Sequence, residues 1–348
     1  MSAKGSLMAL DNMTKNLQRN TLPRLPPLPG FHGHQEYMQQ VELWKKWIAW
    51  EKDDPLVLRD DEPEAYKMRV LYCYKQALMA LRFWPEMWVD AAEWCFQVNM
   101  VQEGVELGIG FLAQGVKANP ESILLALKQA DRVEETHSPG ESDDAKIARG
   151  KAVREPLDKL LTTLYDMYEA LKQREASQVE AMEARAKEKS PANPQAEDDD
   201  DDAKSATSEE AHQPNPLELQ IAAVKQSFAV QKDLLNKTIS FAWIAMARAM
   251  RRIQGKGSPT QLMGGLRQVF TEARRRGKLS SDAYVEVALM ESTVYKDPVG
   301  AKIFERGAQL FSDDESFMIE YLKFLHAKDD ITSEWMQSVM NRLSWAVG

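Results

Sequence analysis

Hydrophobic residues recur along this chain in triplets whose members stand three positions apart. The first triplet consists of Trp44, Trp47 and Trp50. Five more follow the same i, i+3, i+6 rule: Trp88, Ala91, Trp94; Leu124, Leu127, Ala130; Trp243, Met246, Ala249; Tyr284, Val287, Met290; and Met318, Tyr321, Phe324. At about 100° per residue, such a triplet sweeps roughly 120° of an α-helix. A stripe of that width can contact two neighbouring helices, so each triplet predicts a helix within a stack.

The spacing of the triplets predicts a repeat. Most of them start 34 to 44 residues after the previous one, and one gap measures 119 residues. Repeats built from helix pairs have periods in the thirties and forties. Each triplet helix should therefore be followed by a partner helix. The sequence predicts an all-α fold, an α-solenoid of six antiparallel helix pairs with one long insertion.

Composition divides the chain into four regions. Residues 1–34 are expected to be a connector, largely irregular, because the stretch TLPRLPPLPGFHG lacks backbone donors and has fixed φ angles at its prolines. Residues 35–186 carry helix pairs 1 to 3, and residues 217–348 carry pairs 4 to 6. Between them, residues 187–216 are proline-rich and strongly acidic, a composition that predicts a disordered insertion.

Two local features refine this division. Pro156 falls inside the second helix of the third pair, where a kink is expected. The chain ends on the apolar residues Leu343, Trp345, Ala346 and Val347, whereas a stack normally closes with a polar capping repeat. We therefore expect the natural array to be truncated here and to continue beyond Gly348.

Bulk composition restricts the class of protein. With 348 residues, 44% of them hydrophobic, the chain can bury a sizeable core. Its net charge of −9 argues against an extensive nucleic-acid or acidic-membrane surface. No basic-then-apolar leader and no apolar run of membrane-spanning length occurs, so we expect an intracellular protein without a membrane partner. Cys73 and Cys95 lack metal-ligand spacing and are interpreted as ordinary buried thiols.

Positive charge is concentrated between Arg248 and Lys278. The cations there are Arg248, Arg251, Arg252, Lys256, Arg267, Arg274, Arg275, Arg276 and Lys278, and Glu272 is the only acid. One hypothesis is a patch that contacts RNA phosphates or a partner protein. The other is a solvated helix end whose cations complement the helix dipole. The acidic run Asp198 to Asp202 has two similar interpretations, a site for a basic partner or a solvated linker.

The sequence offers no support for catalysis. GKGSP and LMGGL lack the lysine-serine ending of a phosphate-binding loop and are interpreted as a turn and a helix interior. No nucleophile setting, HExxH motif or paired-cysteine signature occurs. We therefore expect no catalytic residue, metal, cofactor or small-molecule substrate. The tryptophans are interpreted as core rather than as an exposed peptide-binding stripe.

The helix pairs resemble the half-a-TPR (HAT) repeat. In that pattern the first helix has aromatic residues three apart and an acid at its end, as in Trp44, Trp47 and Glu51, and a second helix such as AKIFERGAQLF follows. The residues that carry this signature are Trp44, Trp47, Trp50, Glu51, Trp88, Trp94, Trp243, Tyr284, Tyr321 and Phe324. Several longer stretches resemble the fungal-like large HAT subunit of cleavage stimulation factor, also called suppressor of forked. They are VELWKKWIAWEKDDPL, PEMWVDAAEW, DAYVEVALME with KDPVGAKIFERGAQLF, and SFMIEYLKFLHAKDD. The yeast counterpart of this subunit belongs to cleavage factor IA. The similarity extends from about Glu36 to Leu310 and beyond, and it excludes the insertion.

This resemblance implies a right-handed superhelix of HAT pairs and a non-catalytic nuclear scaffold of pre-mRNA cleavage and polyadenylation, with the cytoplasm as a second location. The implied partners are a second copy of the chain, in a homodimer, and other cleavage and polyadenylation factor subunits, with RNA contacted indirectly or weakly. The N-terminal repeats and the proline-rich tail of the family are missing and the acidic insertion is added, so we expect a fragment that covers mainly the C-terminal HAT half.

Three alternatives remain open at this point. A HAT scaffold of splicing or ribosome assembly shares the fold but lacks the sequence WKKWIAWEKDDPL. A direct RNA-binding module would use the basic cluster 248–278. A protein prenyltransferase α-subunit is also built of tryptophan-rich helix pairs, but it would need repeated Asn-Tyr-x-x-Trp-x-x-Arg segments, and none occurs in this sequence.

Overall fold

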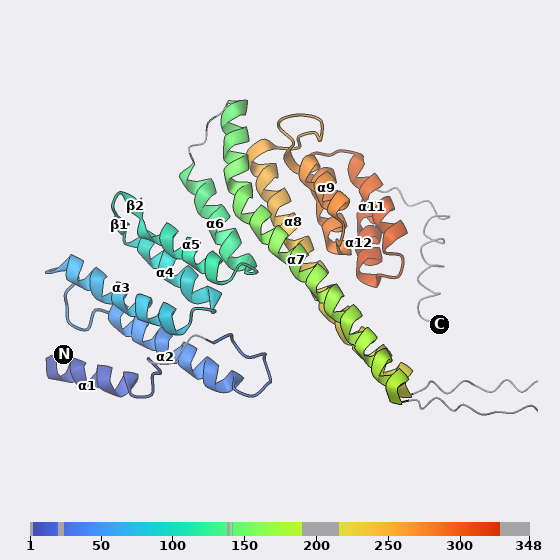
Figure 1. Cartoon of the computed structure of the whole chain (residues 1–348). Coiled ribbons are helices and arrows are strands. Elements are labelled where there is room, and N and C mark those ends of the chain that lie inside the picture. The colour runs from blue at the N-terminus through green and yellow to red at the C-terminus, as the bar shows by residue number, and fades with distance from the viewer. Residues whose placement is uncertain (1–2, 20–23, 138–139, 141, 190–215, 328–348) are drawn as a thin grey trace, which may run out of the picture. The chain divides into compact units, whose positions relative to one another are not determined.

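The fold is taken from a computed structural model, which describes residues 3–19, 24–137, 140, 142–189 and 216–327. Within these residues the chain forms twelve α-helices, one π-helical turn and one two-stranded hairpin (Figure 1). The expectation of an all-α fold is confirmed. None of the described helices is long and apolar enough to cross a membrane.

The elements follow one another in a simple order. The helices are α1 (Ala3–Thr14), α2 (His34–Lys52), α3 (Pro63–Ala80), α4 (Pro85–Gln97), α5 (Leu107–Ala118), α6 (Ile123–Thr136), α7 (Asp143–Lys189), α8 (Pro216–Gln254), α9 (Gly265–Arg276), α10 (Ser281–Leu289), α11 (Val299–Leu310) and α12 (Glu315–His326). The strands are β1 (Val101–Gln102) and β2 (Val105–Glu106), and the π-helical turn η1 (Met290–Val294) continues α10.

The chain divides into two compact units. Unit 1 consists of Met1–Leu160 with Ala245–Val269, and unit 2 consists of Leu161–Ile244 with Phe270–Gly348. The three helices α7, α8 and α9 therefore each contribute residues to both units.

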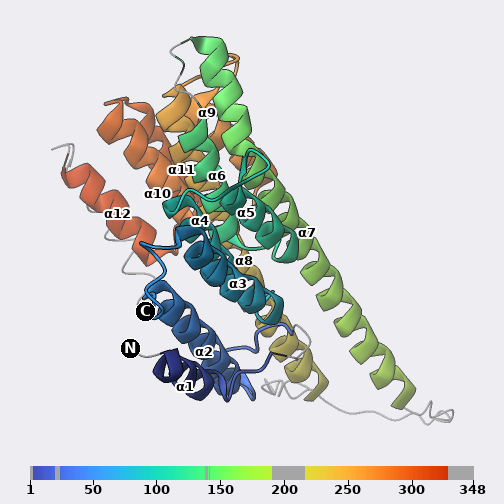
Figure 2. The ribbon, with the colours of Figure 1, turned by 90° about the vertical axis from the view of Figure 1, so that its left-hand side faces the viewer.

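In unit 1, consecutive helices pack against one another. Helix α1 lies against α2 in both views (Figures 1 and 2), α2 packs on α3, α3 on α4, and α4 on both α5 and α6. Proline occupies the first turns of α3 and α4, where its missing N–H costs nothing. The side chains that fill the core are large and almost fully buried: Trp44, Tyr74, Met87, Leu112 and Leu125.

Unit 2 has its own aromatic core. Helix α10 packs on η1, α11 and α12, and α11 also packs on α12. Phe304 of α11 is fully buried, and its ring centroid lies 4.5 Å from that of Phe324 and 5.3 Å from that of Tyr321. The α12 cap Asp314 accepts a 3.1 Å hydrogen bond from the Phe317 backbone N–H and thereby fixes the start of that helix.

Two short elements lie outside the predicted helix pairs. Helix α1 lies within the N-terminal connector, where its Leu10 and Met13 pack against the core cluster of unit 1. The second element is the β1–β2 hairpin, which lies between α4 and the start of α5 at Leu107. Glu103 and Gly104 have φ angles of 54° and 80°, the left-handed pair that a two-residue hairpin turn requires.

The sequence predicts a helix interior for LMGGL, but its glycine pair lies at a helix start instead. Helix α9 begins at Gly265, whose φ is +54°, so the pair forms the entry to the helix. A Cβ on Gly265 would lie 2.5 Å from the Gly255 carbonyl oxygen, which explains why the chain uses glycine where these two backbone segments meet.

Helix α7 continues without interruption through Pro156 and ends at Lys189, and α8 begins at Pro216. Most of the acidic insertion, residues 190–215 with the run Asp198 to Asp202, lies outside the described residues. The same holds for the second helix of the sixth pair and for the apolar end at Leu343, Trp345, Ala346 and Val347.

Candidate interaction surfaces

The aromatic signature residues form the core of both units. Trp44 and Trp47 are 1% and 6% exposed, and Trp50 is half-buried. The other aromatic members of the signature are all buried: Trp88, Trp94, Trp243, Tyr284, Tyr321 and Phe324. These side chains are therefore packing residues rather than an exposed stripe.

The third triplet is only partly buried: its Ala130 belongs to the core, and Leu124 packs against the core from its edge. Leu124 and Leu127 are only half-buried, whereas α6 buries Leu125, Ala126 and Ala130. The segment ILLALKQA is apolar at five consecutive positions, so a spacing of three fits more than one register. Packing against α4 and α5 selects the register that is observed.

Glu51, the acid of the first repeat, is buried and joins α2 to α3. Its Oε1 accepts a hydrogen bond of 3.2 Å from Trp47 Nε1 and one of 3.0 Å from the Arg69 guanidinium, which also donates to Oε2 at 3.1 Å. The carboxylate is 6% exposed and would be costly to bury without these partners. In the second repeat, Glu93 pairs with Lys128 and links α4 to α6.

Sequence reasoning found Glu51 but missed Arg69, its partner 18 residues later. One feature of the sequence could have identified Arg69 as this partner. Arg69 stands directly before the buried Val70 of α3, and its charge is opposite to that of the signature acid. A cation at that place in the partner helix is what a buried helix-end carboxylate requires.

The basic cluster is divided between the two units. In unit 1, Arg252 forms a bidentate pair with Glu134, with N···O distances of 3.1 and 2.7 Å. The Arg149 guanidinium also donates to the Glu134 backbone oxygen at 2.7 Å. Arg252 thus links α8 to α6, and its hydrogen bonds to Glu134 raise the pKa of the guanidinium further above its usual range. Arg248 is exposed, and Arg251 is half-buried.

In unit 2, three of four neighbouring exposed cations lie over buried or half-buried aromatic rings. The exposed cations are Arg274, Arg275, Arg276 and Lys278, and Arg275 is the one without a ring contact. The Arg276 guanidinium stands 4.0 Å from the centroid of the Tyr165 ring, and Lys278 Nζ stands 4.3 Å from that of Tyr168. Such stacking orients the cations while leaving their donors free for an anionic ligand.

Tyr165 connects the exposed cations to the repeat signature. Its hydroxyl donates to the Gly277 carbonyl oxygen at 2.8 Å and accepts a hydrogen bond from Trp243 Nε1 at 3.2 Å. Burial raises the pKa of Tyr165, so the hydroxyl stays protonated and able to donate. Tyr165 and Gly277 are separated by 112 positions, so no local sequence pattern predicts this hydrogen bond.

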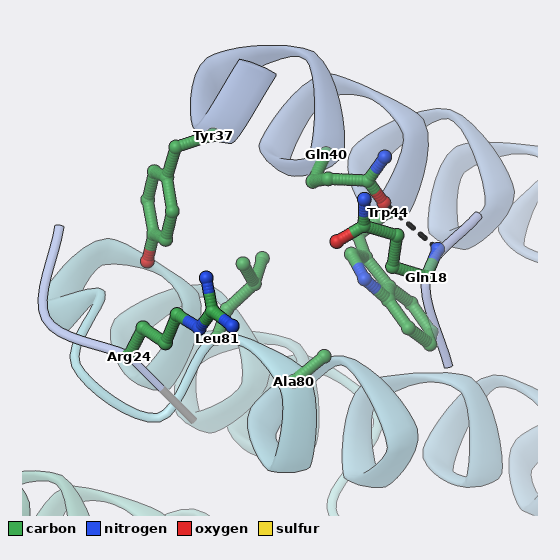
Figure 3. A pocket seen from close by; sticks show the side chains of 7 residues that line it. All are labelled: Gln18, Arg24, Tyr37, Gln40, Trp44, Ala80 and Leu81. Carbon is green, nitrogen blue, oxygen red and sulfur yellow. Dashed lines mark hydrogen bonds between the residues drawn. The ribbon is translucent and has the colours of Figure 1, made fainter. Parts of the chain in front are cut away.

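A small pocket opens beside Trp44 in unit 1 (Figure 3). It has a volume of about 280 Å³ and is lined by Gln18, Arg24, Tyr37, Gln40, Trp44, Ala80 and Leu81. The Tyr37 hydroxyl is buried there without a hydrogen-bond partner, and burial, together with the nearby Glu86, raises the pKa of Tyr37 to about 12. The lining can hold a small apolar group that presents an acceptor, but it contains no nucleophile or acid–base pair.

The two thiols and the acidic side chains add no chemical site. Cys73 and Cys95 are free and buried, and burial raises the pKa of both thiols, to about 11 for Cys95, so both remain protonated near neutral pH. In the part of the chain that the structure describes, no group of three His, Cys, Asp or Glu side chains is placed to hold a metal ion.

Comparison with known proteins gives a consistent result. A family model described as "Suppressor of forked protein (Suf)" matches residues 1–339. The chain is 56% identical over 345 residues to the "mRNA 3'-end-processing protein RNA14" of Gibberella zeae, which covers 99% of this chain and 34% of that protein. It is 50% identical over 356 residues to the "mRNA 3'-end-processing protein rna-14" of Neurospora crassa, covering 99% and 30% respectively. The chain thus spans about a third of the length of these curated relatives.

Proposed function

This chain belongs to the suppressor of forked family, and we propose from this premise that it is a non-catalytic scaffold in pre-mRNA 3′-end cleavage and polyadenylation. The observation that carries the proposal is the match over residues 1–339 to this family, together with relatives described as mRNA 3'-end-processing proteins. The buried signature aromatics fit this role, because they hold helices together and leave the outer surfaces for partner proteins.

The architecture that we propose is a right-handed α-solenoid of HAT helix pairs. Residues 35–186 and 217–348 would hold three pairs each, residues 1–34 would lead into the first pair, and residues 187–216 would form the insertion. Consecutive packing of α2 to α6, and of α10 to α12, supports this arrangement. The proposed partners are a second copy of the chain and other cleavage and polyadenylation factor subunits, in the nucleus.

We expect the intact chain to be a dimer in solution and a version that ends at Asp297 to be a monomer. The truncation removes α11 and α12, and with them Phe304, Tyr321 and Phe324 of the aromatic core of unit 2. Light scattering at several concentrations measures the mass, and far-ultraviolet circular dichroism checks that the truncated version keeps its remaining helices. A mass of one chain for the intact protein at every concentration would count against the dimeric scaffold.

Direct binding of RNA is the second candidate function, and the exposed cations over Tyr165 and Tyr168 favour it. In that case, reversing the charge at three arginines (R274E/R275E/R276E) should weaken binding of a single-stranded RNA. It should also reduce the slope of log affinity against log salt by about 2, since each lost phosphate contact contributes about 0.7. Fluorescence anisotropy at several salt concentrations measures both quantities.

The control for this experiment carries the same change in net charge at another exposed place. Lys45, Lys46 and Lys75 are exposed lysines of α2 and α3, so K45E/K46E/K75E alters the total charge equally without touching the arginines. Equal weakening in both variants would indicate only the long-range effect of net charge. An unchanged affinity and slope in the arginine variant would remove the RNA-binding candidate.

A further inference from the structure

The segment between α1 and α2 exposes large apolar side chains that the core does not use. In the stretch Arg24 to Phe31, which we call the proline strap, Leu25 is 73% exposed, Leu28 is 68% exposed and Phe31 is 70% exposed. None of the three belongs to the core cluster of unit 1 or packs against it. Side chains of this size, gathered in one short surface segment, are typical of a binding site.

The sequence of the proline strap, Arg-Leu-Pro-Pro-Leu-Pro-Gly-Phe, favours a polyproline II helix in its first part. Residues 24–28 form neither helix nor strand, and each proline fixes φ near the value of that conformation. With three residues per turn, Leu25 and Leu28 share one edge, Pro26 and Pro29 share a second, and Pro27 lies on the third.

The pattern of burial indicates which edges are available. Leu25, Leu28 and Pro29 are exposed, whereas Pro26 and Pro27 are half-buried. Pro27 is thus turned toward the protein, and the edge with the two leucines is turned toward solvent. The two leucines are presented outward, each followed by a proline, of which Pro29 is exposed and Pro26 is half-buried.

The C-terminal end of the proline strap is held in a turn. The Phe31 N–H donates to the Leu28 carbonyl oxygen at 3.1 Å, and Gly30 has a φ of +82°, as a type II turn with proline before glycine requires. The His34 N–H in turn donates to the Phe31 carbonyl oxygen at 3.2 Å, at the start of α2. A peptide that is already restrained loses less conformational entropy when it binds.

We propose that the proline strap is a ligand for a protein domain with an aromatic-lined groove of the kind that accepts polyproline II peptides. Leucine–proline pairs at this spacing fill neighbouring pockets between groove aromatics, and the preformed backbone provides the low entropic cost on which such recognition depends. Arg24, which is exposed directly before the first pair, suits a groove with acidic residues at one end. Binding of such a domain is independent of the role in 3′-end processing.

The test uses the full chain, fluorescently labelled, and immobilised isolated WW and SH3 domains as probes. We expect micromolar binding to at least one of these domains. The variant L25A/L28A should bind at least about tenfold more weakly, because both leucines lose their contacts in the groove. The matched control is L7A/M8A, which removes two side chains of similar size that are 67% and 58% exposed on α1. This control should bind as the unaltered chain does.

Each outcome of the test bears on the proposal. Binding to WW domains alone or to SH3 domains alone supports it and identifies the type of groove. The proposal is overturned if no domain binds the intact chain. It is also overturned if L25A/L28A binds as tightly as the unaltered chain, or if L7A/M8A loses as much affinity, since the latter result would indicate unspecific hydrophobic adhesion. All four substituted side chains are exposed, so none of these variants should unfold.

Discussion

Replacing Trp44 by alanine is expected to lower the free energy of unfolding of the chain by about 3–5 kcal/mol. The indole is 1% exposed, and its ring centroid lies 5.5 Å from that of Trp47 in a stacked arrangement with an interplanar angle of 24°. The substitution removes this contact and leaves a cavity that α2 and α3, already joined through Glu51 and Arg69, can close only in part. Urea denaturation followed by circular dichroism measures the change.

The matched control for this prediction is the third member of the same triplet. Trp50 lies on the same helix but is only half-buried, so Trp50→Ala removes an equal volume of side chain and should cost less than half as much. A cost at position 50 that equals the cost at position 44 would mean that the triplet is buried along its whole width, and the observed orientation of α2 would then be wrong.

The period of the hydrophobic pattern was enough to find most of the helices. Trp243, Met246 and Ala249 are all buried, as the i, i+3, i+6 rule requires, and so are the triplets of α4, α12 and the α10–η1 segment. The rule works where polar residues separate the apolar ones at helical spacing, because then only one face of the helix can be buried. It was less exact in α6, where an unbroken apolar run fits several registers and Leu124 and Leu127 are only half-buried.

The contacts that connect separate elements could not be predicted from the sequence. The pairing of Glu51 with Arg69 depends on how α3 lies on α2, and the stacking of Arg276 on Tyr165 depends on the packing of segments more than a hundred residues apart. The β1–β2 hairpin was missed for a different reason. Its turn places a non-glycine residue, Glu103, at positive φ, where sequence preferences give only a weak signal.

Glycine-to-alanine substitutions in α5 are expected to change stability in opposite directions. In an exposed helix this change stabilises by about 0.5–1 kcal/mol, because glycine loses more backbone entropy on folding. Gly110 is half-buried, but a Cβ there would find no atom within 4 Å, so the same gain applies without a clash. At Gly115 the Cβ would lie 2.9 Å from both Cβ and Cγ of Trp88 and 3.0 Å from Leu125 Cδ2. We therefore expect Gly115→Ala to destabilise the chain by about 1–3 kcal/mol.

The comparison of these two sites isolates packing from helix propensity. Both glycines belong to α5, so the gain in backbone entropy is the same, and the difference between the two variants measures only the contact with Trp88 and Leu125. Since Trp88 belongs to the repeat signature, the absence of a side chain at Gly115 allows α5 to pack closely on α4. Thermal unfolding of both variants measures the change in melting temperature. If Gly115→Ala raised the melting temperature as Gly110→Ala should, α5 could not rest on the Trp88 ring, and the packing of the second helix pair would have to be revised.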